Sequence, residues 1–263
     1  MTDSRDDETA HASTSTQQQP VGEPPPADAD GESGGSPSRS AAAALLSVVR
    51  EVALVLGIAL GLSLLIKTFL VQAFYIPSES MENTLLIGDR VLVSKLTPGP
   101  FDLHRGDVVV FSDPGGWLPP SVEPSEGPVR DGVRDVLMFI GLLPSDSSEH
   151  LIKRVIGLPG DTVTCCDTKG RLTVNGVAVD EPYLFPGDDP SDRDFTVTVP
   201  RGRLWVMGDH RSVSEDSRFH RDIGDGTVPI DDVVGRAFVI VWPFDRGSVL
   251  HNPATTFTKV ASP

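Results

Sequence analysis

Two side chains in this sequence could together carry out nucleophilic chemistry: the hydroxyl of Ser80 and the amine of Lys153. A serine hydroxyl is a weak nucleophile until a neighbouring base takes its proton. A lysine can be that base only when it is neutral, and at its ordinary pKa only about 0.1% is neutral near pH 7.4. Because burial can lower a lysine pKa by up to about 3–5 units, this chemistry requires a buried lysine.

The residues around Lys153 are apolar enough to bury it. The stretch LIKRVI reads as a β-strand, in which side chains alternate between two faces. Alternation places Lys153 on the same face as Leu151 and Val155, opposite Ile152 and Arg154. Seventy-three positions separate the serine from this lysine, so only the fold can bring the two side chains together.

Four short motifs surround the two side chains. They are FYIPSESMENTL (74–85), Gly88-Asp89 at the start of a strand, KRVIGLPGD (153–161) and MGDHRSVSEDSR (207–218). Taken singly, each is typical of a turn or a solvated face. Together, and in this order, they closely resemble type I signal peptidases, the membrane-bound serine proteases that remove signal peptides from exported proteins. The resemblance covers about residues 74–242.

This resemblance implies the central roles of the site. It makes Ser80 the nucleophile and Lys153 the general base. The hydroxyl of Ser78 then joins the backbone N–H of Ser80 in an oxyanion hole, which stabilises the charge that develops on the scissile carbonyl.

The same resemblance implies supporting roles around the pair. Ser214 orients the lysine through a hydrogen bond, and Asp216 and Arg218 form a structural ion pair beside the site. Shallow apolar pockets would accept small residues such as alanine and exclude large ones, which gives cleavage after small-x-small sites. The residues that match the pocket walls are Phe74, Ile76, Pro77, Val91 and Ile152.

Two residues depart from the family pattern. Asn83 stands where the family usually has proline, and His210 stands where many members have asparagine. Neither removes a proposed catalytic group. His210 leaves a Ser–His pair as an alternative, although it fits a turn residue better.

Cys165 and Cys166 are adjacent. Consecutive Cα atoms lie about 3.8 Å apart across a trans peptide, whereas ordinary disulfides need about 4.4–6.8 Å. We therefore expect free thiols or packing, with a redox role as the alternative. Histidine and acidic residues show no metal-binding spacing, so we expect no metal and no cofactor.

An apolar run lies just before the serine motif. Val52–Ile66 contains no charge, Lys67 interrupts, and apolar residues continue to Tyr75. Twenty-four helical residues would span about 36 Å, enough to cross a bilayer with Lys67 near one interface. A buried soluble helix is one alternative. A cleavable secretory signal is another, but the segment before the run is long and acidic rather than short and basic.

The first segment, residues 1–42, contains one valine and no Leu, Ile, Phe, Trp or Tyr. Two arginines against eight acidic residues give it a net charge of −6, and we expect it to be disordered. The whole chain of 263 residues carries a net charge of −15, which argues against a nonspecific nucleic-acid binder. Its mean hydropathy of −0.06 argues against a multi-span transporter.

The body is rich in short β-branched runs separated by Gly, Asp and Pro, which predicts a mainly β fold. The expected strands lie within 88–96, 106–111, 151–158, 161–166, 171–179, 196–200, 203–209 and 233–242. Asn175-Gly176 predicts a tight hairpin. Residues 112–150 read as an insertion with an amphipathic helix at 133–143, packed on its own domain or lying at the membrane interface.

We therefore expect a disordered acidic cytoplasmic tail at 1–42, a transmembrane anchor at 43–75 and an extracytoplasmic catalytic domain at 76–263. The fold class is mainly β, a signal-peptidase-like catalytic domain after one transmembrane helix. As the resemblance implies, the protein would be a monomer in the cell membrane. Its partners would be the signal peptides of exported preproteins and membrane lipid, with no nucleic acid.

Two other functions stay open. One is a Ser–Lys self-cleaving regulator of the repressor type, against which the anchor and the lack of a helix-turn-helix pattern argue. The other is a catalytically inactive, membrane-tethered β binding module. The intact set of Ser80, Lys153 and Ser214 argues against that one.

Overall fold

The computed structural model describes residues 38–119 and 150–261, together with Gly127 and Gly132. Most of the predicted insertion at 112–150 lies outside the described residues. This includes its amphipathic stretch at 133–143, so both interpretations of that stretch stay predictions.

The chain divides into two compact units, residues 1–51 and 52–263. The boundary falls inside helix α1 (Ser38–Phe69), the first element of the chain that the structure describes. The division into a tail, an anchor and a catalytic domain stays a prediction.

Helix α1 contains the charge-free part of the predicted apolar run, Val52–Ile66. Its segment Ala43–Phe69 has a mean hydropathy of 2.2 and no buried part, so by length and composition it can cross a membrane. The exposed side chains contradict the alternative of a buried soluble helix. The helix also begins at Ser38, so the prediction that disorder extends to residue 42 was wrong for the last five positions. The last two of these five positions belong to a run of four alanines at 41–44, and alanine is the strongest helix former.

The predicted C-terminal end of this helix was also wrong. The helix ends at Phe69, and Val71–Tyr75 forms strand β1 rather than a last helical turn. Strand β1 pairs antiparallel with strand β2 (Arg90–Ser94), which places Phe74 opposite Val91. Because Phe74 becomes 2% exposed in this arrangement, tertiary packing decides the conformation of a stretch that is apolar in either form.

The remaining strands lie within or close to the predicted ranges, except the two-residue strands β10 and β12, which were not predicted; together they confirm the mainly β fold. They are β3 (Val108–Ser112), β4 (His150–Gly157), β5 (Thr162–Cys165), β6 (Thr173–Val174), β7 (Val177–Ala178), β8 (Phe195–Thr198), β9 (Arg203–Met207), β10 (Val228–Pro229), β11 (Val233–Trp242) and β12 (Ser248–Val249). Short 3₁₀ turns occupy Gly224–Gly226, Ile230–Asp232, Phe244–Arg246 and Ala254–Phe257.

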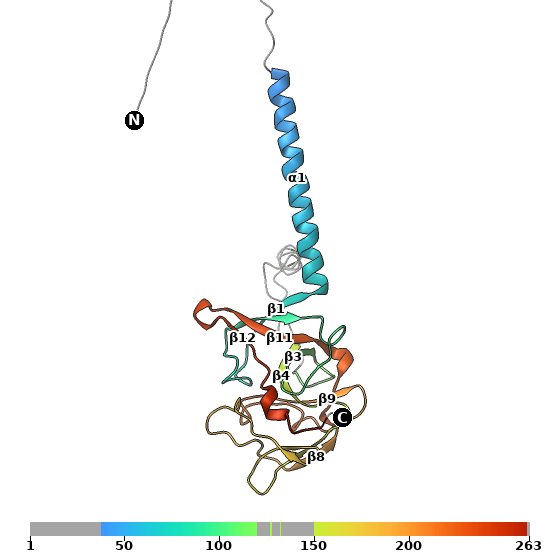
Figure 1. Ribbon diagram of the computed structural model, residues 1–263, viewed down its shortest axis with the longest axis vertical. Helices are drawn as coiled ribbons and strands as arrows, with labels where there is room; N and C mark the ends of the chain where they lie inside the picture. The colour runs from blue at the N-terminus through green and yellow to red at the C-terminus, as the bar shows by residue number, and fades with distance from the viewer. Residues whose placement is uncertain (1–37, 120–126, 128–131, 133–149, 262–263) are drawn as a thin grey trace, which may run out of the picture. The chain divides into compact units, whose positions relative to one another are not determined.

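The described strands form two antiparallel sheets (Figure 1). The larger has the order β1-β2-β11-β3-β4-β9-β10, with β12 paired to β11. The smaller has the order β7-β6-β5-β8. Strand β4 therefore lies in the interior of the larger sheet, between β3 and β9, and seven of its eight residues are buried.

The smaller sheet contains both the confirmed hairpin and a correction. Asn175 and Gly176 join β6 to β7 with φ angles of 54° and 77°, the left-handed pair that a tight hairpin turn requires. Cys165 and Cys166 form a disulfide, so the expectation of free thiols was wrong. That expectation applied the Cα separation of ordinary disulfides to adjacent residues, and the two Cα atoms of this pair lie outside that range, 3.0 Å apart.

Candidate active site

Ser80 lies in a turn between β1 and β2. The chain on either side is fixed by two backbone bonds, from the N–H of Ile76 to the carbonyl of Asp89 and from the N–H of Gly88 to the carbonyl of Ile76. The side chain of Met81 has no exposed surface, and Ser80 itself is 6% exposed. The buried side chain of Met81 thus anchors the turn in the core and fixes the position of the neighbouring Ser80.

Lys153 reaches the serine from the middle of β4. Its side chain is buried, as are Ile152 and Arg154 on the opposite face, so both faces of this strand are covered; Leu151 and Val155 share a core cluster. The Nζ atom of Lys153 lies 2.6 Å from the Oγ atom of Ser80. Burial lowers the pKa of Lys153 to about 8, although the charges of Asp216 and Asp209 oppose this.

The segment after β9 lies next to the serine turn and contributes further residues to the site. Both the N–H of Gly208 and the hydroxyl of Ser214 donate to the carboxylate of Asp216, at 3.0 and 2.9 Å. Arg218 binds the same carboxylate through two nitrogens, at 2.8 and 2.9 Å. Burial by itself raises the pKa of Asp216, but these bonds, those of Arg218 above all, hold it below its ordinary value.

Gly208 lies where this segment meets the turn. A Cβ atom at this position would overlap the Oγ atom of Ser214 and the carbonyl oxygen of Ser80. Only glycine lets the two backbones approach this closely. The missing side chain therefore brings Ser214 and Asp216 beside the serine turn.

A second buried network supports the site, and sequence reasoning missed it. Arg154 binds both carboxylate oxygens of Asp209, at 2.8 and 2.6 Å, and donates to the carbonyl of Gly106 at 2.7 Å. Thr84 donates to the same carboxylate from the serine turn. The only sequence signal was the presence of charged residues inside motifs that must be buried.

The structure brings most of the predicted site residues together. Ser78 Oγ lies 3.4 Å from Ser80 Oγ. The hydroxyl of Ser214 is bonded to Asp216, and its predicted bond with the lysine is not among the described contacts. Four predicted pocket residues, each at most 8% exposed, share one core cluster, whereas Pro77 is exposed. The four are Phe74, Ile76, Val91 and Ile152. Their roles stay predictions.

The imidazole of His210 has no hydrogen bond to the hydroxyl of Ser80 among the described contacts, as a catalytic base would need. Its ring stacks on Phe185 with centroids 3.8 Å apart, and its Nδ1 lies 3.5 Å from a carboxylate oxygen of Glu82. Only its backbone N–H is bonded to Ser80, at the carbonyl oxygen. The hydroxyl of Ser80 is bonded to Lys153 instead, which argues against the Ser–His alternative.

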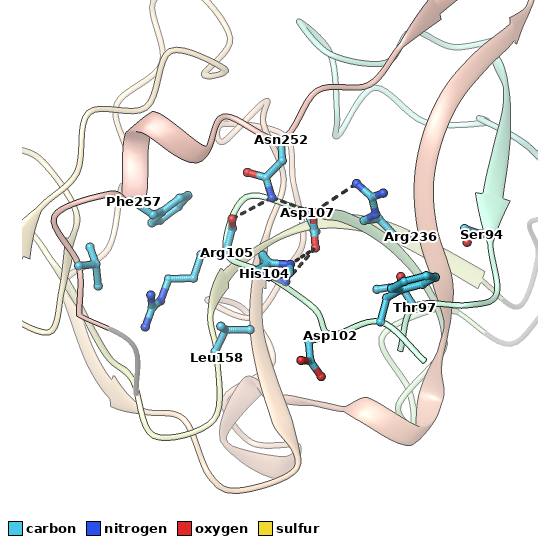
Figure 2. A pocket seen from close by; sticks show the side chains of 12 residues that line it. Ser94, Thr97, Asp102, His104, Arg105, Asp107, Leu158, Arg236, Asn252 and Phe257 are labelled. Atoms are coloured by element: carbon cyan, nitrogen blue, oxygen red, sulfur yellow. Dashed lines mark hydrogen bonds and ion pairs between the residues drawn. The ribbon is translucent and has the colours of Figure 1, made fainter. Parts of the chain in front are cut away.

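A separate cavity of about 760 Å³ contains none of the predicted catalytic residues (Figure 2). Three of its charged side chains form ion pairs. Asp107 lies between Asn252 and Arg236, and Arg105 binds Asp161 at 2.6 and 2.7 Å. Within the described residues, no group of three or more His, Cys, Asp or Glu side chains is placed to hold a metal ion.

Residues 49–242 match the model of a protein family described as signal peptidase, peptidase S26. A signal peptidase I of Mycobacterium tuberculosis is 41% identical over 250 residues, which cover 87% of this chain and 84% of that protein. A probable signal peptidase I of Mycobacterium leprae is 41% identical over 229 residues, covering 76% and 78%. A solved signal peptidase I of Enterococcus faecalis is 26% identical, covers 52% of this chain and 97% of that one, and has a TM-score of 0.34.

Proposed function

The chain belongs to the signal peptidase family S26, and we propose that it is a serine endopeptidase in which Ser80 is the nucleophile and Lys153 the general base. Family membership makes it a protease that cleaves signal peptides, and its apolar helix α1 fits a membrane anchor. The observation that carries the finer assignment is the distance of 2.6 Å between Lys153 Nζ and Ser80 Oγ.

The electrostatic surroundings of the lysine favour this assignment. With a pKa of about 8, roughly a fifth of the Lys153 amine is neutral near pH 7.4, some two hundred times more than for an ordinary lysine. A neutral amine accepts the hydroxyl proton of Ser80 across the same short distance over which the ammonium form donates to it. The pair thus needs no third group to activate the serine.

The first half of the reaction forms an ester. The hydroxyl proton of Ser80 moves to Lys153 as the oxygen attacks the scissile carbonyl carbon. The negative charge on the carbonyl oxygen is stabilised by the backbone N–H of Ser80 and the hydroxyl of Ser78. The Lys153 ammonium then gives its proton to the leaving amine, the carbon–nitrogen bond breaks, and the signal peptide stays attached to Ser80.

The second half releases the signal peptide. Lys153, neutral again, takes a proton from a water molecule whose oxygen attacks the ester carbonyl. The same donors stabilise the second oxyanion, and its collapse returns the proton to the oxygen of Ser80. Gly208 lets Ser214 and Asp216 approach the serine turn, where both Ser214 and the N–H of Gly208 are bonded to Asp216. The charge of Asp216 acts on Lys153 from there.

The proposal also covers the substrate specificity, the partners and the membrane topology of the protein. The buried cluster of Phe74, Ile76, Val91 and Ile152 includes Met81, the residue after the nucleophile. A densely packed wall of this kind favours small residues in the substrate, which fits cleavage after small-x-small sites. The substrates are the signal peptides of exported preproteins. The protein is a single-pass monomer with a cytoplasmic N-terminus and an extracytoplasmic catalytic domain.

Cleavage of a model preprotein by the full chain in detergent tests the assignment. Ser80→Ala and Lys153→Ala should each reduce kcat by at least about a thousand-fold, because the two side chains act as a unit. Lys153→Arg should be equally inactive, since arginine stays protonated. Lys169→Ala, which removes an exposed lysine, is the matched control and should cleave like wild type. Wild-type cleavage by Ser80→Ala or Lys153→Ala would refute the pair.

A further inference from the structure

Two hydrogen bonds attach the turn that carries Ser80 to the segment after β9. The backbone N–H of His210 donates to the carbonyl of Ser80 at 3.2 Å. Four residues along the turn, the hydroxyl of Thr84 donates to the carboxylate of Asp209. The two ends of the turn are therefore bound to consecutive residues, and a displacement of Asp209 or His210 would displace the nucleophile.

The middle of the turn is attached to a third segment. The side-chain amide of Asn83 donates to the carbonyl of Leu184 at 2.9 Å, and the next residue, Phe185, stacks on His210. The N–H of Phe185 in turn donates to the carbonyl of Asp209 at 3.0 Å. Both residues that depart from the family pattern, Asn83 and His210, thus contact one dipeptide.

The backbone of Asn83 accounts for one departure. Its φ angle of +83° lies in the left-handed region, which asparagine tolerates better than most residues. Proline cannot adopt this angle, because its ring fixes φ near about −65°. The turn seen here therefore requires a residue other than proline, and asparagine adds the bond to Leu184.

The imidazole of His210 lies close to the side chain of Glu82, a residue of the same turn. His210 is 9% exposed, and within the described residues its buried Nδ1 has no hydrogen-bond partner. The nearest charged group to it is the carboxylate of Glu82, at 3.5 Å, only slightly beyond a good hydrogen bond. Such contacts often shorten when substrate is bound, and closing this one would satisfy the buried nitrogen and hold the turn.

We propose that Glu82 and His210, braced by the ring of Phe185, are positioning residues that keep Ser80 aligned with Lys153 during catalysis. The inference rests on the proposed function of that pair. Neither residue touches the reacting atoms. They act through the turn, whose displacement would move both the hydroxyl of Ser80 and the N–H that faces the oxyanion.

The full chain in detergent, with a model preprotein, provides the test. Glu82→Ala and His210→Ala should each lower kcat about ten-fold and leave KM within about two-fold, because misalignment affects the chemical step. The double variant should be no slower than the slower single variant, since both remove one contact. Glu82→Gln should restore most of kcat, because its amide oxygen still accepts a hydrogen bond from Nδ1. His104→Ala, an exposed histidine elsewhere, should equal wild type.

Three results would overturn the inference. One is a kcat within two-fold of wild type for Glu82→Ala. Because the side chain of Glu82 is partly exposed, this variant tests the contact even if His210→Ala does not fold. Another is a loss of kcat that the melting curves attribute wholly to unfolded protein. The third is activity in Ser80→Ala, which would refute the proposed function as well. An inactive Ser80→Ala beside an unchanged Glu82→Ala would refute the positioning role alone.

Discussion

Lys153 and Arg154 are neighbours on β4 and are both almost fully buried. Their side chains lie on opposite sides of the strand, and only one of the two positive charges has a carboxylate partner. On one side, Arg154 forms a two-pronged ion pair with Asp209, which raises its pKa although burial alone would lower it. On the other side, within the described residues, no carboxylate lies at ion-pair distance from Lys153, and burial lowers its pKa to about 8. The charge of the paired cation is compensated, whereas burial favours the neutral form of the unpaired one, which is the form that the proposed function requires.

The largest expected effect lies on the paired side. Asp209→Ala leaves the guanidinium of Arg154 buried without its partner, so the free energy of unfolding should fall by about 3–5 kcal/mol. Chemical denaturation at pH 7 measures this. Asp180→Ala, which removes an exposed partner of Arg171, is the control and should change stability little. Equal stabilities of the two variants would contradict the contrast between the two sides.

The unpaired side should respond in the opposite direction. Lys153→Met removes a buried cation whose folded pKa of about 8 lies below its unfolded value of 10.5. Below pH 8 both states of the wild type are protonated, and the full cost of burial, about 3 kcal/mol, is present. Between pH 8 and 10.5 the unfolded state binds more protons, so wild-type stability rises with pH.

Lys153→Met should therefore be inactive but more stable than wild type at pH 7, and its advantage should shrink above pH 8. Unfolding curves at a series of pH values measure this difference. Lys169→Met, which removes the charge of an exposed lysine, is the control for a general effect of charge. A destabilised Lys153→Met at pH 7 would show that the lysine is compensated after all.

The smallest expected effect concerns the support of the lysine. Ser214→Ala removes the bond from its hydroxyl to Asp216, which should lower stability by only about 1 kcal/mol. If Ser214 also orients Lys153, kcat should fall about ten-fold while KM stays constant. Steady-state kinetics and melting curves separate the two contributions. An unchanged kcat would leave Ser214 as a structural residue only.

The sequence predicts most of the strands because they depend on local signals, and it places Ser80 and Lys153 in recognisable motifs, but only the fold brings the two side chains to 2.6 Å, and their catalytic roles stay a prediction. Runs of β-branched residues mark β2, β4 and β11, and the motifs around Ser80 and Lys153 mark the site. Pairing between distant residues has no such signal. Nothing in the spacing of Arg154 and Asp209 reveals their bond, just as nothing reveals that His210 stacks on Phe185.

The errors at the helix and the cysteines have one cause each. Hydropathy continues unchanged from α1 into β1, so it cannot show that the helix ends at Phe69. Only the pairing of β1 with β2, a tertiary contact, decides it. For Cys165 and Cys166, the Cα separation of ordinary disulfides was applied to adjacent residues, which the structure pairs outside that range.

The dependence of kcat/KM on pH tests the central claim most directly, because it reports the ionisation of the free enzyme's base. If the neutral amine of Lys153 is that base, kcat/KM for a preprotein should rise about ten-fold per pH unit at low pH and level off above an apparent pKa of about 8. A profile that is flat between about pH 7 and 9, or one that levels off near the ordinary pKa of histidine at about 6.5, would contradict the account.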